Sequence, residues 1–558
     1  INSVTGNMYI ITSDLTLPGK GLNFSFTRAY NSQAASNSAE IGPLGYGWTH
    51  SYNLYFTQDT QNKLVKIKDD EGKGYLFADN QDGTFISQRG EYSILSKNSS
   101  SFTWRKKDGR RYIFDLAGKL TQITDRNNNS ITLSYNSQSQ LSSIIDTCGR
   151  QINLTYSQGK LTSLTDSSSR TFTYSYDNQG SLVTVTDPLG NSTTYTYDSR
   201  HNLTKKTDSL NQSIYYTYDS YNRCTSSSGE NNAGRVDLAF DPANKQTTIT
   251  DSHNNATVHY YNDDLLIAKV KDAQGKETTS IWDNNFNLVS RTDALGRVTN
   301  MEYDANGNLT KVADPDNNTT SFTYESNFNL LLTSTDAQGN TTTYTRDSFG
   351  NPTKVTDAYN NSTNYTYNSA GQVTSTQNAL GNSTNFTYDT QGNLTQTKDT
   401  LNNITTLSYD TIGNLLQSKD AKSNPTGFTY DKLNQLTKVT YPDDTSVTYA
   451  YDAVGNRTSV TDALGNTTSS TFDQFQRVTS TTDSLGRSIN YTYDTEGNLT
   501  SLTDQNNNQT AYEYDSLNRL ISEADPQGNK KQYQYDAVGN RVTYLDAKNQ
   551  TTTYTYDS

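Results

Sequence analysis

An aromatic residue followed by Asp returns about every 21 residues along most of the chain, from Phe114 and Asp115 to Tyr556 and Asp557. Degenerate copies, such as Tyr135 with Asn136, keep the spacing where the pattern lapses. A fixed period of this length is typical of repeat architectures, in which each unit packs mainly against its neighbours. The period therefore predicts one tandem array where the 558 residues would otherwise suggest three or four ordinary domains.

Each cycle contains two turn signals, as residues 494–498 and 504–508 illustrate. Asp494 can accept a hydrogen bond from the backbone two residues later, and Gly497 can adopt the positive φ of a tight turn. Short runs rich in Leu, Thr and Tyr separate the turns, and such runs favour strands. Each cycle is therefore predicted to be one β-hairpin.

Tyr residues two apart lie on the same face of a strand, so pairs such as Tyr195 with Tyr197 should present two rings together. Stacked hairpins would align these pairs into ladders, and burial of one ring contributes roughly 2 kcal/mol. The hydroxyl keeps one end of each ring compatible with water or a Thr partner. Leu182 and Val185 have opposite parity on the next strand, which a β-bulge would reconcile.

Composition supports a long, polar, all-β chain. Only 31% of the residues are apolar, but 41 Tyr favour strands. The net charge of −13 argues against a nucleic-acid partner, because phosphate binding needs clustered Lys and Arg. No window reaches the roughly 20 apolar residues of a transmembrane helix. We expect the chain to be an excerpt, and any export signal would lie upstream of it.

The N-terminal stretch carries two further motifs, "DLTLPGKGLNFSFTRAYNS" at residues 14–32 and "GPLGYGWTHSYNLYF" at residues 42–56. Together with the Tyr-Asp repeats, they resemble the Rhs (YD-repeat) family, which includes bacterial Rhs toxins, the shell components of Tc toxins and teneurins. The resemblance implies an all-β fold in which tandem YD-repeat hairpins form a spiralling β-sheet shell. It also implies an opening module at residues 1–112, followed by repeats over residues 113–558. In the toxin members the shell holds a C-terminal effector, which is released by autoproteolysis at a core segment next to it. Neither the core segment nor the effector is recognisable in this sequence.

Potential reactive side chains all have simpler explanations. The repeated Asp residues are turn formers, with too few oxygen ligands around them for a calcium ladder. His253 and His259 lack zinc spacing, and His50 is expected to pack within its motif. Cys148 and Cys224 are expected to be isolated buried thiols. No catalytic, cofactor-binding or metal-binding residue is predicted, and no cofactor.

We therefore interpret the chain as a non-enzymatic structural shell of a secreted or surface-exposed protein, which encloses or carries a C-terminal effector segment absent from these residues. The alternative is an extended cell-surface adhesin or fibre, in which exposed Tyr ladders could bind glycans. The expected partners are the downstream part of the same polypeptide, as cargo or further repeats, cell-surface glycans, or neighbouring copies. An enzyme is a distant third, since no catalytic constellation is recognisable.

Overall fold

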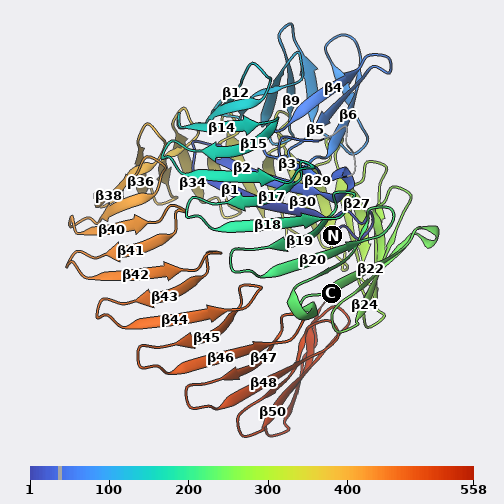
Figure 1. Ribbon diagram of the computed structural model, residues 1–558, viewed down its shortest axis with the longest axis vertical. Helices are drawn as coiled ribbons and strands as arrows, with labels where there is room; N and C mark the ends of the chain where they lie inside the picture. The colour runs from blue at the N-terminus through green and yellow to red at the C-terminus, as the bar shows by residue number, and fades with distance from the viewer. Residues whose placement is uncertain (36–40, 558) are drawn as a thin grey trace.

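The computed structural model describes residues 1–35 and 41–557 and is almost entirely β-sheet (Figure 1). Forty-five strands, from β8 (Ile94–Lys97) to β52 (Thr551–Thr553), form one long antiparallel sheet in which each strand pairs with the next. Among the described residues no ladder joins β52 to β8, so the sheet is an open strip that winds and not a closed barrel. The spiralling YD-repeat β-shell fold is confirmed.

Each 21-residue cycle is a hairpin, as predicted. In one cycle β46 (Ser488–Tyr493) pairs with β47 (Leu499–Thr503), which pairs with β48 (Gln509–Tyr514). At the first turn Asp494 Oδ1 accepts the N–H of Asn498 at 2.8 Å, and Gly497 has a φ of 96°. The turn residues therefore hold the register without help from other parts of the molecule.

A β-bulge reconciles the two apolar positions after the Tyr-Asp turn. Between β16 (Thr171–Tyr176) and β17 (Leu182–Thr186) the register shifts by one residue, so that Tyr176 opposes Leu182. Leu182 and Val185 then face the same side and are 0% and 6% exposed. The same shift recurs in most hairpins of the strip, which confirms the predicted bulge.

The second Tyr of each pair locks successive hairpins together. The Tyr197 hydroxyl donates to the Leu182 carbonyl, 15 residues earlier, at 2.6 Å. The same bond, to the residue 15 positions earlier, is made by Tyr135, Tyr176, Tyr218, Tyr303, Tyr324, Tyr367, Tyr388, Tyr451, Tyr493, Tyr514, Tyr535 and Tyr556. Trp282 and Arg346 make it with ring and guanidinium nitrogens. The hydroxyl proton thus goes to a backbone carbonyl that the neighbouring hairpin offers, a partner that the sequence did not indicate.

The N-terminal strands form two small sheets. The first contains β1 (Tyr9–Leu17), β2 (Phe24–Asn31) and β3 (Trp48–His50), with the short helix α1 (Ser32–Ala35) after β2. The second contains β4 (Tyr55–Asp59), β5 (Leu64–Lys68), β6 (Gly74–Asp79) and β7 (Phe85–Ser87). Their apolar side chains share one core with the Tyr face of the first hairpins. The boundary at residue 112 stays a prediction.

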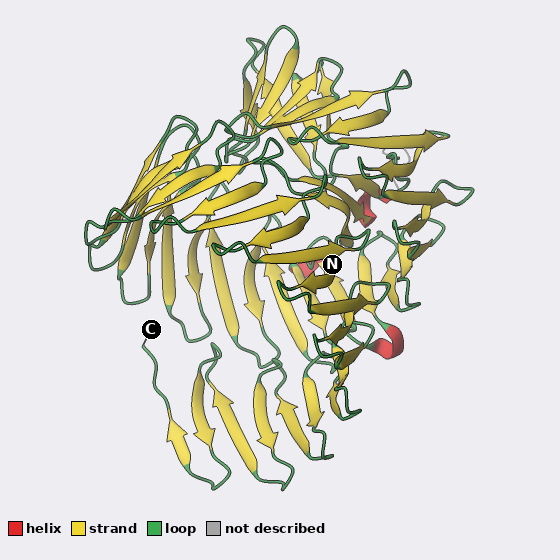
Figure 2. Ribbon diagram, turned by 90° about the vertical axis from the view of Figure 1, so that its left-hand side faces the viewer, coloured by secondary structure: helices red, strands yellow, loops and turns green. Residues whose placement is uncertain are grey.

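The strip winds so that turns far apart in sequence meet along a seam (Figures 1 and 2). We call β8 to β25 (Ile267–Lys271) the first coil and β26 (Glu277–Trp282) to β52 the second coil. Contacts across the seam join residues 195 apart at Tyr92 and Asn287, 224 apart at Asn127 and Asn351, and 244 apart at Ser209 and Ala453. The separation reaches 241 at Asn129 and Ala370 and then stays between 241 and 262 as far as Arg297 and Asp557, so the spiral is tightest at its N-terminal start and keeps a nearly constant girth afterwards.

The turn geometry predicts acid sensitivity. Hydrogen bonds, first of all from Asn340, lower the pKa of Asp336, and equivalent Asn residues do the same for Asp462 and Asp504. A folded-state pKa below the unfolded value contributes stability at neutral pH that is lost as the pH falls through the folded pKa. We expect the melting temperature to be flat near neutrality and to fall below about pH 4.

A variant with Asp336→Asn, Asp462→Asn and Asp504→Asn tests the origin of this loss of stability at acid pH, with melting temperatures measured by calorimetry. Asn378 naturally occupies the same turn position and accepts the same bond from Leu380 N–H, so the turns should persist. The variant should lose less stability between pH 5 and pH 3 than the parent. An equal fall in melting temperature for variant and parent would contradict the assignment of the effect to these turns.

Candidate functional site

A buried ion pair joins the N-terminal sheet to the Tyr face of the first coil. Arg28 on β2 donates from Nε to Asp14 Oδ2 at 2.7 Å and from Nη2 to Oδ1 at 2.9 Å, and the two side chains are 2% and 3% exposed. Tyr174 donates its hydroxyl proton to Asp14 Oδ2 at 2.8 Å, and Arg28 Nη1 donates to the Tyr195 hydroxyl at 3.3 Å. These bonds satisfy charges that burial would otherwise make costly.

The aromatic rings around Arg28 reinforce this charge state. Its guanidinium lies 5.3 Å from the Trp48 ring centroid and 6.0 Å from those of Tyr174 and Tyr195. Burial alone would lower the pKa of Arg28, but Asp14 holds that pKa well above its ordinary value. Burial, and then the Asp14 charge, raise the pKa of Tyr174 far above its ordinary range. Arg28 therefore stays protonated and Tyr174 stays neutral at physiological pH.

The two N-terminal motifs supply the residues that dock on the Tyr pairs. Trp48 Nε1 donates to the Tyr197 hydroxyl at 2.9 Å, and the Trp48 ring meets Tyr195 edge-on with centroids 5.2 Å apart. The Tyr30 hydroxyl donates to the His201 carbonyl at 3.1 Å and accepts from Leu203 N–H at 2.8 Å. Both motifs therefore serve to seat the N-terminal sheet on the inner face of the strip.

His50 packs inside this sheet, as predicted. It is 1% exposed, stacks on Phe26 with ring centroids 4.8 Å apart, and accepts the N–H of Tyr52 at Nδ1. Burial lowers its pKa to about 3, so the imidazole stays neutral at physiological pH. A buried neutral ring with these contacts has a packing role.

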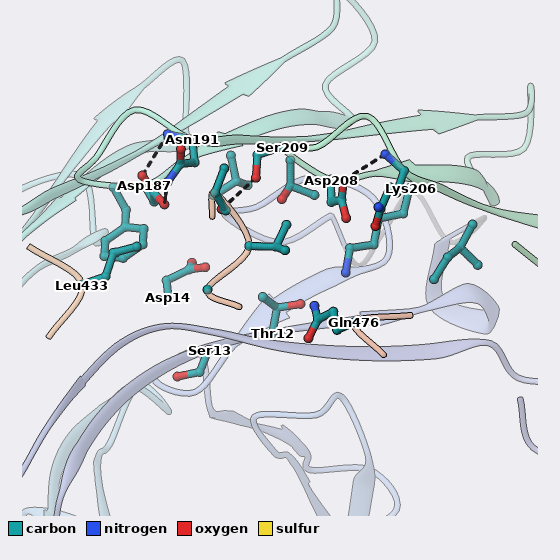
Figure 3. Close-up of a pocket in the computed structure, with 18 of the residues that line it drawn as sticks. Thr12, Ser13, Asp14, Asp187, Asn191, Lys206, Asp208, Ser209, Leu433 and Gln476 are labelled. Carbon is teal, nitrogen blue, oxygen red and sulfur yellow. Dashed lines mark hydrogen bonds between the residues drawn. The ribbon is translucent and has the colours of Figure 1, made fainter. Parts of the chain in front are cut away.

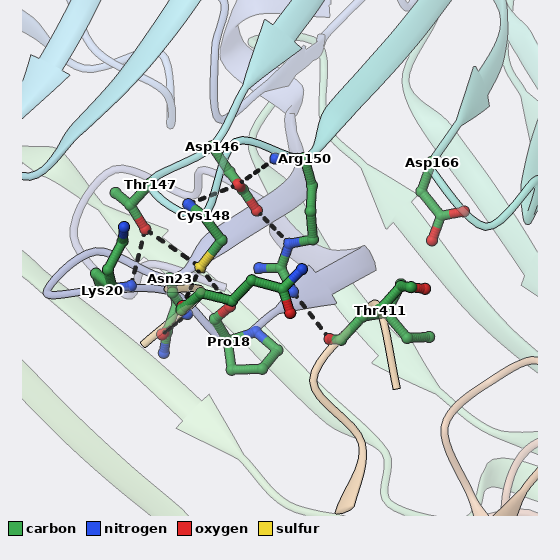
Figure 4. A network of polar contacts seen from close by, with 12 residues as sticks. Pro18, Lys20, Asn23, Asp146, Thr147, Cys148, Arg150, Asp166 and Thr411 are labelled. Carbon is green, nitrogen blue, oxygen red and sulfur yellow. Dashed lines mark hydrogen bonds and ion pairs between the residues drawn. The ribbon is translucent and has the colours of Figure 1, made fainter. Parts of the chain in front are cut away.

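The tip of the β1–β2 hairpin is clamped where the two coils meet (Figure 4). Arg150 is aimed by Asp146, which accepts from Nε at 2.7 Å, and it donates from Nη1 to the Ile412 carbonyl of the second coil at 2.9 Å. Its Nη2 donates to the carbonyl of Pro18 at the hairpin tip. Lys20 N–H donates to Thr147 Oγ1 at 2.8 Å. One guanidinium thus ties three segments together.

The cysteines differ from each other in burial. Cys224 is fully buried, as expected. Cys148 is only half-buried, because it lies at the seam, where its Sγ donates to the Gln391 carbonyl at 2.8 Å. The expectation of a buried thiol was wrong for Cys148, because its turn tip is only partly covered by the β1–β2 hairpin and the second coil.

A cavity of about 410 Å³ lies between β1 and the turn tips of both coils (Figure 3). Thr12 and Asp14 line it from β1, Lys206 and Asp208 from the first coil, and Gln476 from the second coil. No His or Cys belongs to its described lining, so a Ser-His or Cys-His nucleophile has no place there. Its size and polar lining suit small polar solutes.

Along the whole described chain, backbone N–H groups occupy the turn carboxylates. Asp198 Oδ1, for instance, accepts from Arg200 N–H and Asn202 N–H at 2.9 Å each. Across residues 1–35 and 41–557, no group of three or more His, Cys, Asp or Glu side chains is placed to hold a metal ion. None of the described helices has the length and apolarity needed to cross a membrane.

An acidic turn in the N-terminal module predicts the opposite pH response to the repeat turns. Burial, and then the neighbouring charge of Asp69, raise the pKa of Asp70 to about 6. A raised carboxyl pKa means that ionisation costs stability as the pH rises above that value. We expect Asp70→Asn to stabilise the protein at pH 8 by roughly 1–3 kcal/mol. The gain should vanish at pH 5 in thermal melts, and an equal gain at both pH values would contradict this origin.

The seam residues were not anticipated from the sequence. A signal was present, because Arg four residues after the turn Asp recurs at Arg150, Arg170 and Arg297. Each of these Arg residues donates across the seam from Nη1, at 2.9–3.2 Å, to the carbonyls of Ile412, Lys432 and Asp557 respectively. The buried Asp14–Arg28 pair has no comparable local signal.

Three family models match parts of the chain. Residues 1–77 match "Domain of unknown function (DUF6531)", and residues 416–558 match "Teneurin YD-shell". "RHS Repeat" matches residues 156–190, 179–213, 303–333, 326–362 and 367–404. The matches follow the division between the N-terminal motifs and the repeats.

Curated relatives include the "tRNA nuclease WapA" of Bacillus subtilis (strain 168), which is 28% identical over 142 residues. The "tRNA3(Ser)-specific nuclease WapA" of Bacillus spizizenii matches to the same extent. Each match covers 25% of this chain and only 6% of the relative.

Among solved structures, "Crystal Structure of TcdB2-TccC3-TEV" aligns with a TM-score of 0.45 and 13% identity, over 95% of this chain and 32% of that one. "Structure of Photorhabdus luminescens Tc holotoxin pore, Mutation TccC3-D651A" aligns with a TM-score of 0.37 and 11% identity. That alignment covers 97% of this chain and 35% of the other.

Proposed function

We propose, on the premise that the chain belongs to the Rhs/YD-repeat family, that it forms the wall of a structural shell which encloses or carries another polypeptide segment. The observation that carries the proposal is the N-terminal sheet, which lies against the Tyr face of the first coil. There Arg28, Asp14 and Trp48 join that sheet to the Tyr face. A winding wall that already holds a segment of its own chain against one face is suited to enclosure.

Thiol labelling tests enclosure in the whole chain, with Cys148→Ser and Cys224→Ser as background. β42 (Ser446–Tyr451) places Val447 on the same face as Tyr449, and Ala450 on the opposite, exposed face. A small maleimide should label both Val447→Cys and Ala450→Cys. A large PEG-maleimide should label Val447→Cys more slowly than Ala450→Cys.

Two other results would count against the shell. If neither reagent reaches Val447→Cys, the wall surrounds a dry packed axis, as a compact rod would. If both reagents label the two positions alike, the strip encloses nothing. The alternative, an adhesin or fibre, further predicts that sedimentation shows assemblies growing with protein concentration.

We further propose that this chain is itself non-catalytic, and that it works outside the cell in a secreted or surface-exposed protein. The buried neutral His50 and the bonded turn carboxylates support the first point. Purified protein should leave tRNA intact, because the nuclease names belong to relatives that it matches over 6% of their length. Cleavage that disappears in His50→Ala would refute the proposal.

A further inference from the structure

The second coil ends in a rim of turns that carries apolar side chains. Five tip residues on this rim are strongly exposed: Tyr359 (84%), Leu380 (85%), Leu401 (79%), Leu464 (88%) and Leu485 (74%). Each is the third residue of its turn, and its N–H is fixed by the Asp or Asn that begins the turn. The rim therefore presents a row of exposed apolar side chains, one on each of several rigid turns.

The first coil shows the surroundings of apolar side chains at the same turn position. Leu189 and Leu210 hold the same turn position there and are only 47% and 37% exposed. Leu189 shares a pocket with Tyr449 and Tyr451 of the second coil. Next to Leu210, Ser209 Oγ donates to the Ala453 carbonyl at 2.8 Å. The Leu189 tip thus lies beside a Tyr pair of the second coil, and the turn of Leu210 lies against the turn that follows that pair.

Arg487 on the rim is oriented in the same way as Arg150, which forms a hydrogen bond between the two coils. Asp483 accepts from Arg487 Nε at 2.7 Å, as Asp146 does from Arg150. Arg150 then donates from Nη1 to a turn carbonyl of the following coil. Among the described residues the Arg487 side chain is hydrogen-bonded only to Asp483, and it is 55% exposed. Asp483 thus orients the Arg487 guanidinium as Asp146 orients that of Arg150, but no backbone carbonyl accepts a hydrogen bond from Arg487 among the described residues.

We propose that this rim, residues 357–487, is a docking surface for a row of Tyr-Asp turns of the same hairpin repeat. The surface continues an existing interface, because Arg297 Nη1 already donates to the Asp557 carbonyl at 3.2 Å. The occupant supplies a Tyr pair beneath each Leu tip and a turn carbonyl for Arg487. Rim docking rests on the proposed shell role, since it extends the same wall, but it can fail while enclosure holds.

Hydrogen–deuterium exchange on a lengthened chain tests the docking. A second copy of residues 348–558 is fused directly after Asp557, so that the Tyr-Asp spacing continues unbroken and the added hairpins reach the turn expected opposite Arg487. Amides of the turns at residues 378–382 and 462–466 should exchange about tenfold more slowly than in the 558-residue chain. A Gly/Ser tail of equal length should give no protection.

Variants of the lengthened chain separate specific docking from general crowding. Leu464→Asp with Arg487→Ala should restore fast exchange at residues 462–466, whereas Lys422→Ala, at a polar tip of the same rim, should not. Circular dichroism checks that the added hairpins fold. Folded hairpins with unprotected rim turns, or equal loss of protection in Lys422→Ala, would overturn the proposal. Thiol labelling of Val447→Cys would still report on enclosure.

Discussion

Arg28→Ala should cost roughly 3–5 kcal/mol of unfolding free energy, because it leaves the Asp14 carboxylate buried without a counter-charge. Tyr174 would still donate to Asp14, but one neutral hydrogen bond cannot replace a two-bond ion pair. Urea unfolding followed by tryptophan fluorescence measures this loss, since Trp48 lies 5.3 Å from the guanidinium. The fluorescence change should report undocking of the N-terminal sheet from the first coil.

A double-mutant cycle isolates the ion pair. Asp14→Ala with Arg28→Ala should cost clearly less than the two single changes added together, since neither charge is then left unpaired. Arg89→Ala serves as control, because its ion pair with Asp264 is nearly half-exposed and should be worth under about 1 kcal/mol. Additive losses in the cycle would show that Arg28 acts only through packing.

Tyr195→Ala should destabilise the protein by about 3–5 kcal/mol, whereas Tyr449→Ala should cost roughly half as much. The two residues hold the same position in their hairpins, but Tyr195 is 2% exposed beneath Trp48 and Tyr449 is half-buried. Beside Tyr449 lies Arg457, with its guanidinium 5.6 Å from the ring centroid. The loss of unfolding free energy should therefore depend on how deeply each ring is buried, since the two Tyr residues hold the same position in their repeats.

Chemical denaturation of both variants tests this order. Ala450→Ser, on the opposite face of the same strand, should have little effect. A larger loss at Tyr449 than at Tyr195 would show that the N-terminal sheet does not cover the first coil as the contacts indicate. Equal and small losses at both would exclude the Tyr pairs as a source of stability.

Most of the local structure could be predicted from the sequence because its bonds are local. The bond from Asn498 N–H to Asp494 spans four residues, and the bond from Tyr197 to Leu182 spans 15. The period, the hairpins and the bulge between Leu182 and Thr184 follow from turn chemistry and strand alternation. The hydroxyl partner was missed, because the sequence does not show which carbonyl the neighbouring hairpin offers.

The seam, the rim and the buried ion pair were decided only by the tertiary structure. Arg28 meets Tyr195 across 167 residues, and Arg150 meets Ile412 across 262. Which turns meet depends on the twist that accumulates over many hairpins, and a small change per strand shifts every later contact. Near-identical hairpins therefore become covered or exposed according to their place in the spiral. By itself the sequence determined the repeating hairpin, whereas the winding decided which Tyr pairs are buried and which Leu tips stay free.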